Sequence, residues 1–175
     1  METFFIIIEV LKAISISLGV GSSTLAIALY LGSLSNDGKI DKSEKRMLGV
    51  VYTVLRLSMV LIFITHLITN IPLYMVGGAE YLVSPLNFIQ WLILLILYVN
   101  ALLMTAHIMP DTYGPGIQVA TWFSLGVITV LGDLVVIDIS IFIMSYIVFT
   151  ILAIWLIGVF KRDLKVIQKR KRMLR

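Results

Sequence analysis

The chain has 175 residues, of which 59% are hydrophobic and 14% are charged, and it carries a formal net charge of +4 and no cysteine. A soluble domain averages about 45–50% apolar and about 25% charged residues, so this composition, with a mean hydropathy of +1.02, places the chain in the membrane class. The lack of cysteine excludes disulfides, thiolate metal sites, iron–sulfur clusters and cysteine nucleophiles.

Five apolar segments are predicted to be transmembrane helices, because each supplies the roughly 20 residues that cross a hydrocarbon core. They lie at about residues 4–34, 47–71, 86–109, 116–134 and 139–160. The chain is therefore expected to be all-α, with a five-helix transmembrane bundle at residues 1–160 and a basic tail at residues 161–175. The first segment contains Glu9 and follows no basic region, so we expect it to be retained rather than removed as a signal peptide.

Small residues recur along the first segment. Ser15, Gly19 and Ser23 follow one another every four residues, and Ala28 and Gly32 repeat that spacing. Small residues at this spacing let two helix backbones approach closely in lipid, so we expect this face to pack against another helix.

The first linker, SLSNDGKIDKSE at residues 33–44, has two interpretations. Aligned on Gly38, it matches the second half of a calcium-binding helix–loop–helix loop, but serines stand where that loop has its first two carboxylates. In the simpler interpretation, Asp41 and Glu44 form a capping box at the start of the next helix. Capping is favoured, and weak calcium binding is the alternative.

Basic residues predict the orientation, because cytoplasmic loops of membrane proteins are rich in lysine and arginine. They occur in the first linker (Lys39, Lys42, Lys45, Arg46) and in the tail (Lys161, Arg162, Lys165, Lys169, Arg170, Lys171, Arg172, Arg175). With five spans, both regions lie on one side of a cell membrane, so the N-terminus is expected outside and the C-terminus in the cytoplasm. The tail is expected to contact anionic lipid headgroups and not nucleic acid.

The second segment carries polar side chains that are unusual in a membrane span. With about 100° of rotation per residue, Tyr52, Arg56, His66 and Asn70 share an arc about 80° wide. A charge inside the membrane costs at least ~2.5–3.5 kcal/mol, and no carboxylate of the sequence is expected at the depth of Arg56. Arg56 is therefore expected either to reach the cytoplasmic headgroups with its long side chain or to bind an anionic group in a cavity facing the cytoplasm.

The third segment repeats the pattern with Gln90, Asn100 and His107, which fall within about 100° of one another. We expect the two polar stripes to face each other, which makes these helices central in the bundle. Arg56 and Asn100 both lie about nine residues, roughly 14 Å, from the cytoplasmic ends of their helices, so they can be neighbours. Asn70, Gln90 and Asn100 are expected to hydrogen-bond between helices.

The two histidines raise the question of a haem or a metal ion. His66 and His107 are expected to lie more than ~20 Å apart in depth, so they cannot coordinate one iron together. A haem with a single histidine ligand, or a metal site formed by His66 with Glu9 or Asp133, is the alternative to a histidine that is hydrogen-bonded within the bundle. No cofactor is assigned from the sequence.

Three stretches together carry a resemblance to known proteins. They are SLGVGSSTLAIALYL (17–31), DGKIDKSEKRMLGVVYTVLR (37–56) and NALLMTAHIMPDTYGPGIQVATWFSLG (100–126). They resemble an uncharacterised family of small multi-pass bacterial membrane proteins, which implies a shared helical membrane fold and no particular activity. The chain is also faintly similar to copper-resistance-type and b-type cytochrome-like membrane bundles, although those place histidines on their first spans and this first segment has none.

These features favour a small transporter or channel in which polar stripes line a path around Arg56. Five spans make a thin wall, so such a path is expected to need a homo-oligomer. The alternative is a non-catalytic accessory, scaffold or lipid-binding subunit, and a third choice is a redox protein that binds haem or quinone. An enzyme is not indicated, because no metalloprotease motif and no paired carboxylates at one depth are present.

Overall fold

The computed structural model describes residues 2–36, 41–82, 84–110, 112–131 and 138–173. These residues form α1 (Glu2–Asn36), α2 (Lys42–Leu82), α3 (Pro85–Thr105), α4 (Tyr113–Leu131) and α5 (Ile139–Met173), and they include no strand. The predicted all-α fold is confirmed. Four helices contain stretches that are long and apolar enough to cross a membrane, at Thr3–Ser33, Lys42–Pro72, Pro85–Thr105 and Ile139–Leu164.

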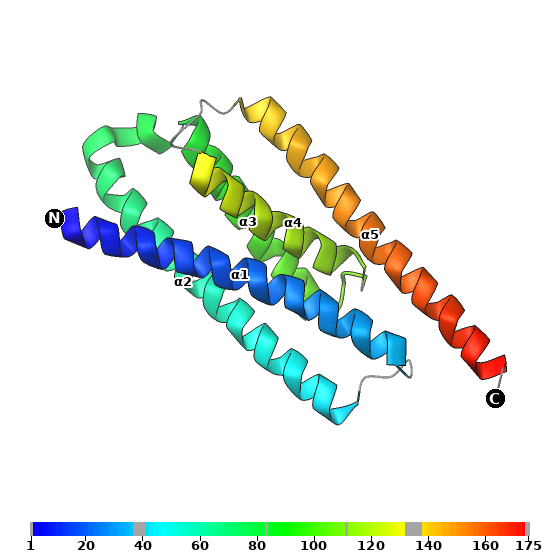
Figure 1. Ribbon diagram of the computed structural model, residues 1–175. Helices are drawn as coiled ribbons and strands as arrows, with labels where there is room; N and C mark the ends of the chain where they lie inside the picture. Colours follow the sequence, from blue (N-terminus) through cyan, green and yellow to red (C-terminus); the bar gives the residue numbers. More distant parts are fainter. Residues whose placement is uncertain (1, 37–40, 83, 111, 132–137, 174–175) are drawn as a thin grey trace.

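Successive helices run in opposite directions, so the bundle has two ends (Figure 1). α1 and α2 lie side by side as an antiparallel pair. The end of α1, the start of α2, the end of α3 and the C-terminal part of α5 lie at one end, which we call the basic end. It carries Lys42, Lys45, Arg46, Lys161 and Arg162. The chain begins at the other end, which we call the N-terminal end (Figure 1).

α4 is the innermost helix: it packs against α1, α3 and α5, and half of its described residues are buried, a larger share than in any other helix. Its Trp122 is fully buried, as are Ile93 and Leu97 of the neighbouring α3. Together with Met59 and Ile62 of α2, these residues belong to one apolar core. In lipid, close packing of such side chains holds helices together, since the hydrophobic effect between helices is weak there.

The small residues of α1 face the bundle over part of the helix. Ser15, Gly19 and Ser23 are buried, as expected. The Ser15 hydroxyl donates to the carbonyl one turn earlier at 2.7 Å, so burial does not leave it without a partner. Ala28 and Gly32 are exposed, so the prediction that they pack against another helix is wrong in this chain.

α2 continues through a segment that was expected to be a linker. The prediction ended this helix near residue 71, because proline and paired glycines are typical of loops. The helix instead runs to Leu82 with Pro72 inside it, and Figure 1 shows its last part curving away from α1. Proline lacks an N–H and clashes with the carbonyl four residues earlier, which can bend a helix without ending it.

Aspartates cap the starts of α2 and α5. Asp41 Oδ1 accepts a hydrogen bond from the Glu44 N–H at 2.7 Å, and Glu44 Oε2 accepts one from the Asp41 N–H at 3.0 Å. This reciprocal pair is the predicted capping box. Residues 37–40, which the calcium-loop alternative needs, lie outside the described residues. Asp138 Oδ1 accepts from the Ser140 N–H at 2.8 Å and caps α5.

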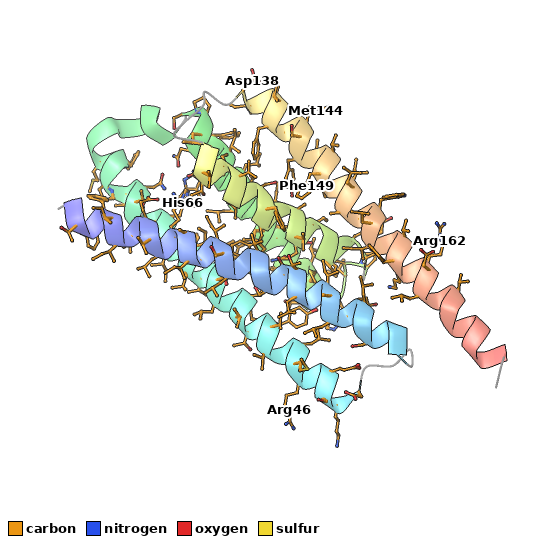
Figure 2. The ribbon with its side chains drawn as sticks, in the orientation of Figure 1. Arg46, His66, Asp138, Met144, Phe149 and Arg162 are labelled. Carbon is orange, nitrogen blue, oxygen red and sulfur yellow. The ribbon has the colours of Figure 1, made fainter. Side chains whose placement is uncertain are left out.

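α5 lies at the periphery of the bundle and exposes most of its surface. It has 35 residues, roughly 52 Å, and continues as a helix through the basic residues after position 160. Large apolar side chains such as Met144 and Trp155 are exposed, and Figure 2 shows Met144 pointing away from the other helices. A hydrogen bond of 3.0 Å between the hydroxyls of Thr121 and Tyr146 joins α5 to α4. An exposed apolar surface of this extent is typical of contact with lipid.

Candidate functional site

A cavity of about 360 Å³ lies between the five helices at the basic end. Its volume falls within the range of about 300–1,000 Å³ that is typical of small-molecule sites. The helices contribute Ser23, Ala26, Ile27, Tyr30, Tyr52, Leu55, Met104, Pro115, Gln118 and Ile157, and the α3–α4 connection contributes His107, Met109 and Pro110. Most of these side chains are apolar, and a few polar groups among them are available to orient a ligand.

A hydrogen-bonded pair of amides lies beside this cavity. Asn100 Nδ2 donates to the Gly114 carbonyl at 3.0 Å and to Gln118 Oε1 at 2.9 Å. The Gly114 carbonyl fixes the orientation of the Asn100 amide, because only its nitrogen can donate to a carbonyl. Gln118 must then present its oxygen to Asn100. Its Nε2 is buried without a partner among the described residues, while Gln118 lines the cavity.

A contact between α5 and α1 borders the cavity. Lys161 Nζ lies 5.6 Å from the centroid of the Tyr30 ring, within the range of a cation–π interaction. Tyr30 lines the cavity, so this contact positions α5 beside it. Arg46 and Arg162 are exposed at the same end, and Figure 2 shows both pointing away from the bundle. The end of the bundle that contains the cavity therefore carries more basic than acidic side chains among the described residues.

His107 has a left-handed backbone conformation where it lines the cavity. Its φ is 58°, in the region that favours glycine. Its N–H donates to the Met104 carbonyl at 3.1 Å, and the Ile108 N–H donates to the Leu103 carbonyl at 3.1 Å. These bonds end α3 in a Schellman motif, in which glycine usually occupies this position. An L residue there costs about 1–2 kcal/mol.

Arg56 lies on the exposed surface of α2 and not between the helices. The buried face of α2 includes Leu55, Ile62 and His66, and its centre lies about 100° around the helix from Arg56. Asn100 turns toward Gln118 of α4, so its amide nitrogen donates hydrogen bonds to α4 and not to Arg56. The exposure of Arg56 agrees with a side chain that reaches toward headgroups.

A second group of polar side chains lies toward the N-terminal end, where Figure 2 shows His66. His66 is 2% exposed, and its ring meets the Trp91 ring of α3 with the centroids 4.6 Å apart. Asn70 donates from Nδ2 to the His66 carbonyl at 2.7 Å. Lys12 of α1 is 9% exposed. It is level with His66 in the antiparallel pair of α1 and α2, because Lys12 lies 24 residues before the end of α1 and His66 lies 24 residues after the start of α2. We call Lys12, His66, Asn70 and Trp91 the N-terminal polar cluster.

Hydrogen bonding in the N-terminal polar cluster is incomplete. His66 Nε2, Asn70 Oδ1 and Trp91 Nε1 are buried and have no partner among the described residues. Lys12 Nζ lies 3.6 Å from Glu9 Oε2, which is longer than the about 2.7–2.9 Å of a charge-assisted hydrogen bond. A buried polar group without a partner costs about 1–3 kcal/mol. The cluster therefore has unused capacity to bind a polar group.

The polar stripes of α2 and α3 meet at only part of their predicted length. Tyr52 of α2 and His107, just after α3, both line the cavity. His66 instead contacts Trp91, which is not part of the predicted α3 stripe, Asn100 faces α4, and Gln90 is partly exposed.

From the sequence, Lys12 is one of the groups that could approach His66 and Asn70 near the outer leaflet, but its burial on the small-residue face of α1, three residues before Ser15, was not predicted. Sequence reasoning also did not single out Trp91, which looks like any other apolar residue of a span.

The two histidines lie near opposite ends of α3. Trp91, which contacts His66, is separated from Ala106, which precedes His107, by about four helical turns or roughly 22 Å. A single iron therefore cannot bind both. Of the residues considered for a metal site with His66, Asp133 lies outside the described residues. Among the described residues, no group of three or more histidine, aspartate or glutamate side chains is arranged to hold a metal ion.

Comparison of the chain with protein-family models, curated proteins and solved structures finds no match. The fold and the cavity still define a class of protein. The part of the chain that the structure describes is an all-helical bundle, with four helices long and apolar enough to cross a membrane and a mostly apolar cavity at the basic end.

Proposed function

We propose that the protein is an integral membrane protein that binds an amphipathic small molecule in the cavity at the basic end and catalyses no reaction. The cavity is the observation that carries this proposal, because it has the size of a ligand site and all five helices contribute to its wall. This function corresponds to the lipid-binding subunit that the sequence offers as the alternative to a transporter. A quinone, which the sequence suggests as a ligand of a redox protein, would belong to the same class of amphipathic ligand.

The chemistry of the wall suggests what the ligand contains. The apolar side chains, including Met104 and Met109, suit a flexible hydrocarbon body, since methionine adapts to irregular shapes. Gln118 Nε2 is a buried donor, so a carbonyl or another acceptor oxygen on the ligand would satisfy it. The basic residues around the cavity add an attraction for acidic amphiphiles.

We place this cavity in the half of the bundle that faces the cytoplasm. α4 has 19 residues, roughly 28 Å, which is close to the ~30 Å of a hydrocarbon core, so we assign it as the fifth span. The basic end would then be cytoplasmic, with the N-terminus outside. A ligand would enter from the inner leaflet or from the cytoplasm.

Native mass spectrometry of the protein released from lipid nanodiscs tests the proposal. The wild-type chain should retain a small molecule. Ala26→Phe should abolish retention, because Ala26 lines the cavity and phenylalanine would fill it. Ala28→Phe is the matched control, since Ala28 lies one half-turn further along α1 and is exposed. Gln118→Met should weaken retention without filling the cavity.

Melting curves in the same nanodiscs would establish that each variant is folded. A wild-type chain without a retained molecule, including after incubation with a lipid extract, would refute the proposal. Equal retention by folded Ala26→Phe and Ala28→Phe would also refute it, because the molecule would then be bound elsewhere.

Transport through a path lined by Arg56 stays a prediction. Arg56 is exposed, and the apolar core of Ile62, Leu97 and Trp122 lies between the two polar groups of the described residues. A path that includes Arg56 would therefore form between copies of the chain and not through one copy. Flux of a solute into liposomes measures this function. Transport is supported if the flux depends on protein concentration and is lost in Arg56→Gln.

A further inference from the structure

We propose that the N-terminal polar cluster is an oxyanion site that binds a phosphate or carboxylate group. Three helices contribute side chains to it, because Lys12 comes from α1, His66 and Asn70 from α2, and Trp91, whose ring meets that of His66, from α3. It lies in the half of the bundle opposite the amphiphile cavity and shares none of the residues that line that cavity. The proposal is therefore independent of the function proposed for the cavity.

The charge of the cluster selects an anion. Among the described residues, Lys12 is buried and no aspartate or glutamate is. The carboxylate of Glu9 is 51% exposed and stands 3.6 Å from the ammonium group, so it compensates the charge only in part. A cation in surroundings of low dielectric attracts an anion strongly, and a second cation would be repelled.

The free hydrogen-bonding atoms match an oxyanion as well. Lys12 Nζ, His66 Nε2 in its protonated tautomer and Trp91 Nε1 are N–H donors, and the last two have no partner among the described residues. Asn70 donates its Nδ2 to the His66 carbonyl, which leaves Oδ1 as an acceptor. That oxygen would receive a hydrogen bond from a protonated phosphate or a hydroxy acid.

The position of the cluster allows an oxyanion to reach it. The apolar stretch of α1 has 31 residues, roughly 46 Å, and therefore exceeds a hydrocarbon core of ~30 Å. Lys12 lies about nine residues, roughly 14 Å, from the start of that stretch, so it is near the boundary of the core. A dissolved phosphate ion and the phosphate of a lipid headgroup can both approach this depth. Both carry the oxyanion that the cluster is proposed to bind.

Thermal melting with two probes tests the proposal and separates these sources. The first probe is inorganic phosphate, titrated in mild detergent against potassium chloride of equal ionic strength. The second is phosphatidylglycerol, compared with phosphatidylcholine alone in nanodiscs. A ligand that binds the folded state raises the melting temperature in a saturable way. Saturation by inorganic phosphate indicates a dissolved ion, and a rise with phosphatidylglycerol alone indicates a headgroup.

Lys12→Met removes a charged hydrogen-bond donor. It should therefore lower, by about tenfold or more, the apparent affinity for the probe that raises the melting temperature. Lys42→Met is the control, since Lys42 is exposed at the opposite end, and it should leave the response unchanged. His66→Gln supplies a second test if Lys12→Met does not fold, and it should also weaken the response. The proposal is overturned if neither probe produces a saturable shift or if the folded Lys12 and His66 variants respond like the wild type.

Discussion

The ring of Trp122 in α4 lies against the backbone of Gly19 in α1, in space that a β-carbon at position 19 would occupy. Gly21, two residues further along the same helix, has no atom near the position of a β-carbon. The two glycines therefore have different roles. Gly19 allows α1 to approach the innermost helix, whereas Gly21 only lowers the helix propensity of α1.

Alanine at these two positions should change stability in opposite directions. Gly19→Ala should destabilise the bundle by about 1–3 kcal/mol, because the indole ring must move to admit a methyl group. Gly21→Ala should be neutral or stabilise the protein by up to about 1 kcal/mol, as expected for a helix interior. Thermal melting of both variants in one detergent measures the difference. An equal response would show that Trp122 is not packed tightly against α1.

The amide pair beside the cavity should show energetic coupling. Asn100→Leu removes the donor for Gln118 Oε1 and for the Gly114 carbonyl, so it should destabilise the protein by about 0.6–1.7 kcal/mol. Gln118→Leu should destabilise the Asn100→Leu variant less than it destabilises the wild type. A double-mutant cycle measures this difference in the free energy of unfolding. Gln90→Leu, on the partly exposed side of α3, serves as the control and should change stability by less than about 0.5 kcal/mol.

Glycine at position 107 should relieve the backbone cost at the end of α3. His107→Gly should stabilise the folded state by about 0.5–1 kcal/mol, since glycine adopts a positive φ freely but loses more entropy on folding. His107→Ala keeps the β-carbon and should show no such gain. If His107→Gly melts no higher than His107→Ala, the left-handed conformation is not the source of the cost.

The capping box at the start of α2 should be independent of calcium. Asp41→Ala should destabilise the protein by about 0.5–2 kcal/mol, and Glu44→Ala should have an overlapping effect because the two side chains cap reciprocally. Ser43→Ala is the neighbouring control. Melting curves recorded in calcium chloride and in a chelator should coincide, and a calcium-dependent shift lost in Asp41→Ala would restore the calcium-loop interpretation.

Single cysteines should report the orientation of the bundle, and the cysteine-free chain makes them unambiguous. Ser43→Cys lies at the basic end, and Ser84→Cys lies at the start of α3 near the opposite end. In intact cells, a thiol reagent that does not cross membranes should label Ser84→Cys and spare Ser43→Cys. Labelling in the reverse pattern would place the N-terminus inside.

Local spacing was enough to predict the parts of the fold that depend on near neighbours. The apolar segments became helices, and the three-residue interval from Asp41 to Glu44 became a capping box. The continuation of α2 past Pro72 was missed, because a proline that bends a helix and one that ends it look alike in sequence. Whether a proline bends a helix or ends it depends on how the neighbouring helices pack around it.

The site was harder to predict, because helical periodicity gives the angles between side chains but not the direction that faces the bundle. Arg56 was grouped with His66 and Asn70, and it lies at the edge of their arc, outside the buried face. Asn100 was expected to be buried and hydrogen-bonded between helices, which the structure confirms, but its partner is on α4. Pairing between helices depends on which helix is innermost, and no pattern within a single helix reveals that.

The exposure of α5 has a practical consequence for handling the protein outside a membrane. Most of the surface of α5 would rest on lipid, while its Ile157 forms part of the cavity wall. A detergent that replaces the surrounding lipid will act on this helix before it reaches the buried core. The cavity is therefore expected to lose its shape, and any bound molecule, under conditions in which α1 to α4 still melt cooperatively. A preparation that appears stable by melting can already have lost its ligand, so nanodiscs are the better starting material.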